Sequence, residues 1–297
     1  MQLFLLVVLT MVAFAANSIL NRLALADGLI GALPFAALRL ASGAAVLCAL
    51  VMLQRKTVPL RSPGRWIGVA SLTLYMTGFS VAYVGIEAGV GALILFGGVQ
   101  VTMFGGAILA GKTIPPAQWL GAALAFGGLC WLLWPSGGAA PSTVHAALML
   151  AAALGWGIYS LAGAKAGAPL PATAANFALA TPIALALMLA APLFEAGGDP
   201  AAELTAAGVG LAVVSGVVTS GLGYALWYML LPRLAPTVAA LAQLSVPVIA
   251  MAGGMLFLGE TLTLRFVLAA TLVLGGIAVG VLVPRRAAQR TSRSSGS

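Results

Sequence analysis

The chain has 297 residues, of which 62% are hydrophobic and only 7% are charged, and its formal net charge is +8 at pH 7. A soluble core cannot enclose that much apolar surface, so the composition excludes a soluble globular protein and predicts an integral membrane protein. The basic excess is interpreted as a signal for topology and for contact with anionic membrane lipid, not as a nucleic-acid footprint.

Ten apolar stretches approach the length of about 20 residues that crosses roughly 30 Å of hydrocarbon as a helix. They lack the alternating pattern of a lipid-facing barrel, and backbone inside lipid must satisfy its own hydrogen bonds. The sequence therefore predicts an all-α integral membrane protein. The predicted spans are, in chain order, residues 2–21, 31–53, 66–85, 88–110, 116–134, 143–163, 171–193, 205–229, 234–258 and 262–283.

Charged residues divide between the two ends of these spans. The basic residues on loops of one parity and after the last span are Arg55, Lys56, Arg61, Arg65, Lys112, Lys165, Arg233, Arg285, Arg286, Arg290 and Arg293. The acidic residues favour the opposite end, at Asp27, Glu87, Glu195, Asp199, Glu203 and Glu260. Cytoplasmic loops of membrane proteins are enriched in Lys and Arg, so both termini are predicted to be cytoplasmic.

An internal repeat divides the chain into two halves. The stretch "GGAILAGKT" at Gly105–Thr113 returns as "GGMLFLGET" at Gly253–Thr261, with a lysine replaced by a glutamate. Five spans in each half is an odd number, so the second half must enter the membrane upside down. This predicts two inverted five-helix repeats at residues 1–135 and 142–284, followed by a basic tail at 285–297 outside the fold.

Two longer stretches resemble a known family. They are "PVIAMAGGMLFLGETLTLRFVLAATLVLGGI" at Pro247–Ile277 and "ALGWGIYSLAGAKA" at Ala153–Ala166. Both are similar to the EamA-type ten-helix exporters of the drug/metabolite transporter superfamily, and most of all to bacterial aromatic amino-acid exporters. The first half departs from the family pattern, with Lys112 at an acidic position and "GVQ" at Gly98–Gln100 where proline is common. Its first span also lacks the glutamate of the small multidrug relatives, which argues against proton-coupled export of cationic drugs.

Aromatic residues follow two spans at helical spacing. Tyr75, Phe79 and Tyr83 recur every four residues in span 66–85, so they form one stripe. Tyr224 and Tyr228 do the same in the eighth span. We expect the two stripes to form opposite walls of a cavity that binds an apolar side chain and an ammonium group. The alternative interpretation is an interfacial belt or tight helix packing.

Arg39 is the one formal charge well inside a predicted span. Burying an arginine near mid-membrane costs about 2.5–3.5 kcal/mol on insertion scales, so something must offset it. A substrate carboxylate, outward snorkelling or a helix C-terminal carbonyl would each do so. The glycines Gly276 and Gly280 in the last span predict a close helix-packing seam.

Further polar and aromatic side chains inside the spans complete the predicted substrate-binding set, and they are Asn17, Gln100, Trp156, Tyr159, Asn176 and Gln243. Pro247 has no N–H, so the backbone carbonyl of Gln243 loses its helical partner. A kink there would present that carbonyl and the Gln243 amide to a ligand. The alternative is that Ser245 or water satisfies the carbonyl.

A transporter explains these features better than the other classes. A membrane enzyme needs a catalytic constellation, and a selective channel needs a repeated filter; the sequence contains neither. The family resemblance implies export of amino acids by alternating access across a bacterial inner membrane, by a monomer or weak homodimer without cofactor or metal. Export of other metabolites such as nucleosides or drugs is the alternative. Because no span interior contains a carboxylate, we expect a facilitator rather than an ion-coupled pump.

Overall fold

The computed structural model describes residues 2–26, 28–86, 88–133, 143–194, 204–249, 252 and 264–294, and within these ranges it contains helices and no strand. The helical elements are α1 (Gln2–Ala26), α2 (Ala32–Leu53), α3 (Arg65–Gly85), α4 (Ala88–Leu109), α5 (Pro116–Leu133), α6 (Thr143–Gly163), α7 (Pro169–Phe194), α8 (Ala206–Val214), the π-helix η1 (Ser215–Leu222), α9 (Gly223–Leu230), the 3-10 turn η2 (Leu231–Arg233), α10 (Pro236–Gln243) and α12 (Leu264–Ser294).

Local sequence signals explain where several of these helices begin. Pro116 and Pro236 occupy the first helical position of α5 and α10, where a missing N–H removes no helical hydrogen bond. Thr205 caps α8, because its hydroxyl accepts a hydrogen bond from the Gly208 backbone N–H at 3.0 Å. The same hydroxyl donates to the Leu29 carbonyl at 2.8 Å, so the cap also ties α8 to the turn before α2.

Among the described residues, six helices are long and apolar enough to cross a membrane, and they cover Gln2–Leu25, Ala32–Leu53, Arg65–Gly85, Thr143–Gly163, Pro169–Ala190 and Ala206–Arg233. Shorter apolar helices occupy Ile94–Leu109, Pro236–Ile249 and Val267–Val283. These segments agree with the spans expected from the sequence, so an all-helical, multi-pass membrane protein is confirmed. The total of ten spans stays a prediction.

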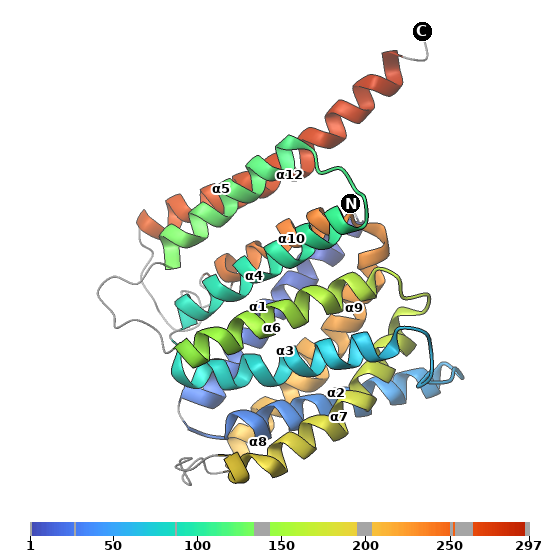
Figure 1. Cartoon of the computed structure of the whole chain (residues 1–297), viewed down its shortest axis with the longest axis vertical. Helices are drawn as coiled ribbons and strands as arrows, with labels where there is room; N and C mark the ends of the chain where they lie inside the picture. Colours follow the sequence, from blue (N-terminus) through green and yellow to red (C-terminus); the bar gives the residue numbers. More distant parts are fainter. Residues whose placement is uncertain are drawn as a thin grey trace.

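The helices form a bundle with two distinct edges. At one edge α5 packs along α12, and at the opposite edge α2 packs along α7 (Figure 1). Between these edges α3 packs on α6, α4 contacts both α6 and α10, and α1 contacts α8, η1 and α9 in turn. The largest buried cluster of side chains lies in this central part of the bundle.

The α5–α12 contact is a glycine seam, as Gly276 and Gly280 predict. A Cβ atom added to Gly121 of α5 would lie 2.5 Å from the carbonyl oxygen of Gly276 and 2.7 Å from the backbone nitrogen of Gly280. The two backbones are therefore in direct contact, which is how small residues hold helices together in lipid.

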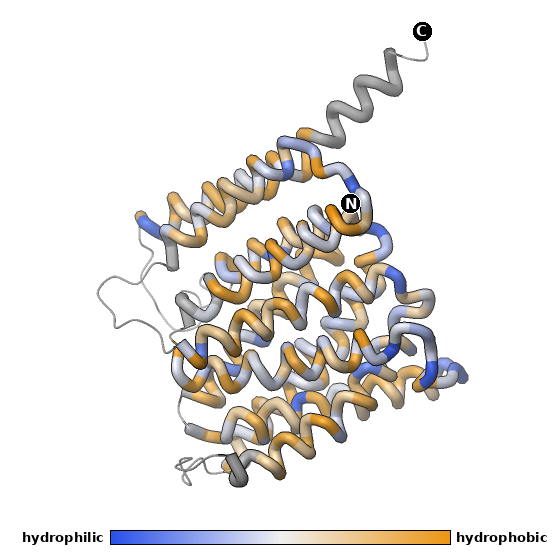
Figure 2. Tube along the Cα trace, in the orientation of Figure 1, coloured by the Kyte–Doolittle hydropathy of each residue, from blue (hydrophilic) through white to orange (hydrophobic). Residues whose placement is uncertain are grey.

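The polar loops gather at one end of the bundle. The start of α1, the end of α12 and the α2–α3, α4–α5 and α6–α7 loops lie at the same end (Figure 1). Figure 2 shows hydrophilic segments concentrated there, while the helices themselves are mostly hydrophobic. This grouping agrees with the shared parity of the basic loops in the sequence.

Three expectations about individual helices need correction. The eighth predicted span is not a single α-helix, since the π-helix η1 separates α8 from α9. The helix of the ninth span breaks after Gln243, as Pro247 predicts. The correction concerns Ser245, whose hydroxyl donates to the Ala242 carbonyl at 2.7 Å and not to the carbonyl of Gln243. The last helix continues to Ser294 into the predicted tail, where alanine, arginine and glutamine favour helix.

Some sequence features fall outside the described residues. They are the second copy of the repeat at Gly253–Thr261 and the acidic residues Asp27, Glu87, Glu195, Asp199, Glu203 and Glu260.

Candidate functional site

A small cavity lies among buried side chains in the middle of the bundle. Its volume is about 20 Å³, which is room for roughly one water molecule. Helices α1, α3, α4, α6, α9 and the segment that contains α10 contribute its lining, which is Phe14, Asn17, Ser18, Tyr75, Phe79, Leu95, Phe96, Trp156, Tyr224, Gln243 and Val246. Six predicted site residues, from both halves of the chain, therefore meet at one place.

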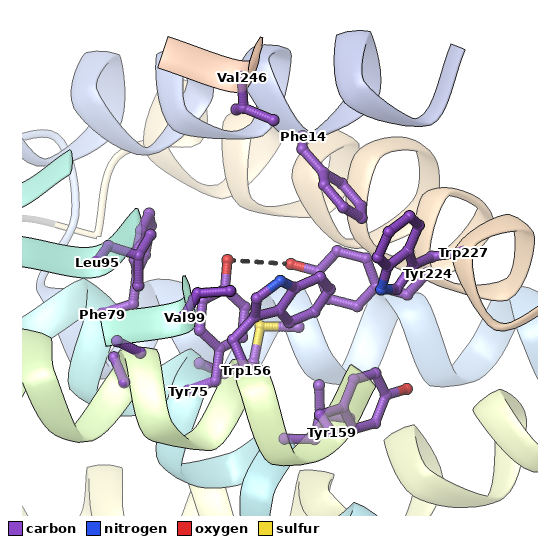
Figure 3. Packing of buried hydrophobic residues seen from close by; sticks show 14 of the residues in the cluster. Phe14, Tyr75, Phe79, Leu95, Val99, Trp156, Tyr159, Tyr224, Trp227 and Val246 are labelled. Carbon is purple, nitrogen blue, oxygen red and sulfur yellow. Dashed lines mark hydrogen bonds between the residues drawn. The ribbon is translucent and has the colours of Figure 1, made fainter. Parts of the chain in front are cut away.

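Aromatic rings close this cavity. Trp156 lies at the centre of the group, with ring centroids 4.8 Å from Tyr75, 4.6 Å from Tyr224 and 5.2 Å from Phe14. Figure 3 shows these rings converging from separate helices, with the Tyr75 and Tyr224 hydroxyls joined by a hydrogen bond. Edge-on and tilted packing of this kind suits the ring quadrupoles and adds to the stability of the closed arrangement.

Arg39 lies directly behind the aromatic wall. Its side chain is fully buried, its Nε donates to Ser220 Oγ at 2.6 Å, and its Nη2 donates to the Tyr224 hydroxyl at 2.5 Å. The guanidinium carbon is 5.8–6.0 Å from the ring centroids of Tyr75, Phe79 and Tyr224. The alternative that Arg39 snorkels outward is wrong, because hydroxyl groups and ring faces of the core hold it in place.

Asn17 of α1 contacts the π-helix η1 at three points. Its Oδ1 accepts hydrogen bonds from Ser215 at 2.6 Å, Thr219 at 3.0 Å and Ser220 at 3.5 Å. A π-helix makes i→i+5 hydrogen bonds, so residues five apart come close to the same face. The local π geometry therefore lets Ser215 and Ser220 reach the same amide oxygen.

Glycines let η1 approach α2 closely enough to make these contacts. A Cβ atom at Gly216 would overlap the Arg39 carbonyl and the Ser42 hydroxyl, and one at Gly43 would lie 2.8 Å from the Gly216 carbonyl oxygen. The two helices thus touch backbone to backbone. This close crossing of α2 and η1 places the Arg39 side chain of α2 against Ser220 of η1.

Gln243 provides a hydrogen-bond acceptor at the cavity. Its Nε2 donates to the Ala239 carbonyl and to the Met103 sulfur, both at 3.3 Å, which fixes the orientation of the amide. Its Oε1 accepts a hydrogen bond from the indole N–H of Trp156. An amide oxygen has two lone pairs, so Gln243 retains acceptor capacity beside the cavity.

Three of the predicted site residues, Tyr159, Asn176 and Tyr228, form a second cluster together with Arg65. Arg65 donates to Asn176 Oδ1 at 2.9 Å, Asn176 donates to the Tyr228 hydroxyl at 3.2 Å, and Tyr228 donates to the Tyr159 carbonyl at 3.2 Å. Arg65 also donates to the Ala172 carbonyl at 3.0 Å. This cluster joins α3, α6, α7 and α9 and does not line the central cavity, so the expectation that Tyr159, Asn176 and Tyr228 face it is corrected.

Tyr83 and Gln100 also lie away from the cavity lining. Tyr83 is half-buried and packs edge-on against Phe79 with centroids 4.7 Å apart. Gln100 is buried, and neither amide atom has a hydrogen-bond partner among the described residues. Of the aromatic stripe on α3, Tyr75 and Phe79 line the cavity and Tyr83 does not.

Phe14, Ser215 and Thr219 belong to the site, but the sequence reasoning missed them. Phe14 lies three residues before Asn17, so helical spacing places both on one face of α1. That spacing is a signal the sequence does contain. Ser215 and Thr219 reach Asn17 through the π-helix, for which no sequence pattern was available.

Polar side chains such as Asn17 and Gln243 beside a mainly aromatic cavity inside apolar helices are typical of a membrane protein that handles a small solute. Comparisons with known proteins agree. Residues 144–282 match the EamA-like transporter family. An uncharacterized protein of Pseudomonas aeruginosa is 47% identical over 282 residues, which are 95% of this chain and 94% of that protein. A solved crystal structure with 22% sequence identity matches 93% of this chain and 98% of its own with a TM-score of 0.74, which supports the fold.

Residues 144–282 of the chain therefore form an EamA-like transporter domain. Membrane transport of a small solute is the activity that this family indicates.

Proposed function

We propose that the protein exports amino acids, including large apolar and aromatic ones, by alternating access across the bacterial inner membrane. The observation that carries the proposal is the aromatic cavity, which combines the fixed amide oxygen of Gln243 with the hydroxyl and amide groups of Tyr75 and Asn17. Such a cavity offers an apolar surface for a side chain and both donors and acceptors for a polar head group.

The closed state of the cavity supports alternating access. A volume of about 20 Å³ is far too small for an amino acid, so substrate binds only after the walls separate. The helix contacts are also symmetric between the two halves. The third span packs on the sixth (α3 on α6), and the equivalent eighth span packs on the first (α8–α9 on α1). The contacts α2–α7, α4–α10 and α5–α12 each join a span of the first half to its equivalent in the second. A two-fold axis in the membrane plane produces such reciprocity, which supports two inverted repeats that rock about a central site.

The orientation we propose has both termini in the cytoplasm. The basic loops gather at one end of the bundle, and the positive-inside rule assigns that end to the cytoplasm. Impermeant labelling of a cysteine placed at residue 60 tests this in intact cells. Labelling of residue 60 from outside would contradict the proposed topology.

The mode of transport we propose is facilitated. The acidic residues lie at the ends of the predicted spans and in loops, so no span interior contains the carboxylate that ion-coupled transporters use. The solute then runs down its own gradient. Uphill accumulation driven by an imposed pH or sodium gradient would contradict this part of the proposal.

A flux panel in proteoliposomes tests the substrate. We expect efflux of radiolabelled phenylalanine, tryptophan and leucine that exceeds that of uridine and of a cationic drug. The control replaces Trp156 with Ala, which removes the central ring and should abolish selective flux while the protein still inserts. Uridine or drug flux without amino-acid flux would favour the alternative substrates.

A further inference from the structure

Arg39 imposes a direction on the hydrogen bonds around it. Arginine carries five N–H donors and no acceptor, so any hydroxyl bonded to it must accept. Ser220 accepts from Nε at 2.6 Å and Tyr224 accepts from Nη2 at 2.5 Å. The proton of each hydroxyl must therefore be donated to a different partner.

Both hydroxyl protons point toward residues that line the cavity. The Tyr224 hydroxyl donates to the Tyr75 hydroxyl at 3.3 Å, and Ser220 Oγ donates to Asn17 Oδ1 at 3.5 Å. Two donor chains thus begin at Arg39, and they end at Tyr75 and Asn17, which come from different helices.

The chains leave two donors for a bound solute. Tyr75 accepts from Tyr224, so its own hydroxyl proton is available to a ligand. The Asn17 oxygen already accepts from Ser215 and Thr219 in addition to Ser220, which leaves its Nδ2 protons for the cavity. One O–H donor and one N–H donor are therefore available at the cavity, with a buried cation behind them.

We propose that Arg39 is a positioning residue for substrate recognition: it fixes Tyr75 and Asn17 as donors, and these donors bind the carboxylate of the transported solute. The inference rests on the proposed transport through this cavity and names the group of the solute that is recognised. Arg39 acts through the chains rather than by a direct ion pair, because its neighbours Tyr75 and Tyr224 line the cavity and Arg39 does not.

This assignment changes the role expected for the aromatic wall. The rings of Tyr75, Phe79 and Tyr224 already have the guanidinium within 6.0 Å, so an ammonium group at that wall would meet a like charge and two donors. The oxygen of Gln243 is the acceptor that an ammonium group would find instead. The carboxylate is therefore essential for binding, and the ammonium is dispensable.

Three probes with the same phenyl side chain test this directly. They are phenylalanine, 3-phenylpropanoate, which lacks the ammonium, and 2-phenylethylamine, which lacks the carboxylate. Their binding to the purified full-length protein is measured by competition against radiolabelled phenylalanine and against radiolabelled 3-phenylpropanoate. We expect both carboxylates to bind and the amine to bind at least about tenfold more weakly.

Variants then test the role of the chains. Tyr75→Phe should weaken binding of both carboxylates about tenfold and leave that of the amine unchanged. Thr77→Val is the matched control, because it deletes a hydroxyl of the same helix that bonds to the Thr73 carbonyl outside the cavity. Arg39→Gln should lower the ratio of carboxylate to amine binding, whereas a purely structural arginine would weaken all probes equally. If Arg39→Gln does not fold, Tyr224→Phe interrupts the same chain with a smaller change.

The outcomes separate the two proposals. Amine binding as tight as phenylalanine binding, or a Tyr75→Phe protein with unchanged carboxylate affinity, overturns the role of Arg39 while amino-acid export stands. Binding of 3-phenylpropanoate without transport of any amino acid supports the donor site and overturns the export proposal. Binding of none of the three probes overturns both.

Discussion

Two arginines connect to tyrosines of the same short helix α9, and they do so in opposite surroundings. Arg39 is fully buried, and it donates hydrogen bonds to the side chains of Ser220 and Tyr224. Arg65 lies at the start of α3, is half-buried, and donates to the Ala172 carbonyl as well as to Asn176, which in turn reaches Tyr228.

The difference shows what each arginine does. A buried cation loses much of its hydration, so its position is costly unless the protein uses the charge. An arginine near a helix end keeps partial access to water and gains a backbone acceptor, which is a favourable way to join helices. We therefore interpret Arg65 as a structural clamp and Arg39 as part of the transport site.

Replacing each arginine with methionine should give the largest effect and should separate the roles of Arg39 and Arg65. Arg39→Met removes the origin of both donor chains, each worth about 1.5–3 kcal/mol, so flux per folded molecule should fall by at least about 100-fold. Arg65→Met should lower the melting temperature and leave flux per folded molecule within about twofold, since its contacts lie outside the cavity. Flux in proteoliposomes, normalised to monodisperse protein, measures both. Equal losses of flux would mean that the two arginines share one role.

A bulky residue at Gly216 should separate α2 from η1. Gly216→Leu forces a side chain into the Arg39 carbonyl, which costs about 1–3 kcal/mol of stability and moves Arg39 away from Ser220. The matched control is Gly210→Leu on α8, where an added Cβ meets nothing within 4 Å. Thermal unfolding in detergent and flux are both measured. A Gly216→Leu protein as stable and active as the control would show that the close crossing is unnecessary.

The smallest effect is expected in the Arg65 cluster. Asn176→Ala removes the link between Arg65 and Tyr228 and should reduce the free energy of unfolding by about 0.6–2 kcal/mol, the range measured for interhelical hydrogen bonds in membranes. Transport per folded molecule should stay unchanged. A selective loss of phenylalanine flux at unchanged stability would assign this cluster to the substrate path after all.

The sequence predicted the features that depend on one helix or one loop at a time. Span length, basic loops and the Gly276–Gly280 seam follow from residue type and spacing along the chain, and the structure agrees with them. The identity of most cavity side chains was also within reach, because polar and aromatic groups in apolar spans tend to face the protein interior.

Which of those side chains share a site depends on tertiary packing and could not be predicted from the sequence. Tyr75 and Tyr83 are on one stripe, but eight residues of helix extend about 12 Å, which a cavity for one water cannot cover. Arg39 bonds to residues 181 and 185 positions further along the chain, and that pairing depends on the glycine crossing of α2 with a π-helix. Helix rotation and close backbone approach are set by packing between distant segments, so spacing within one segment does not determine them.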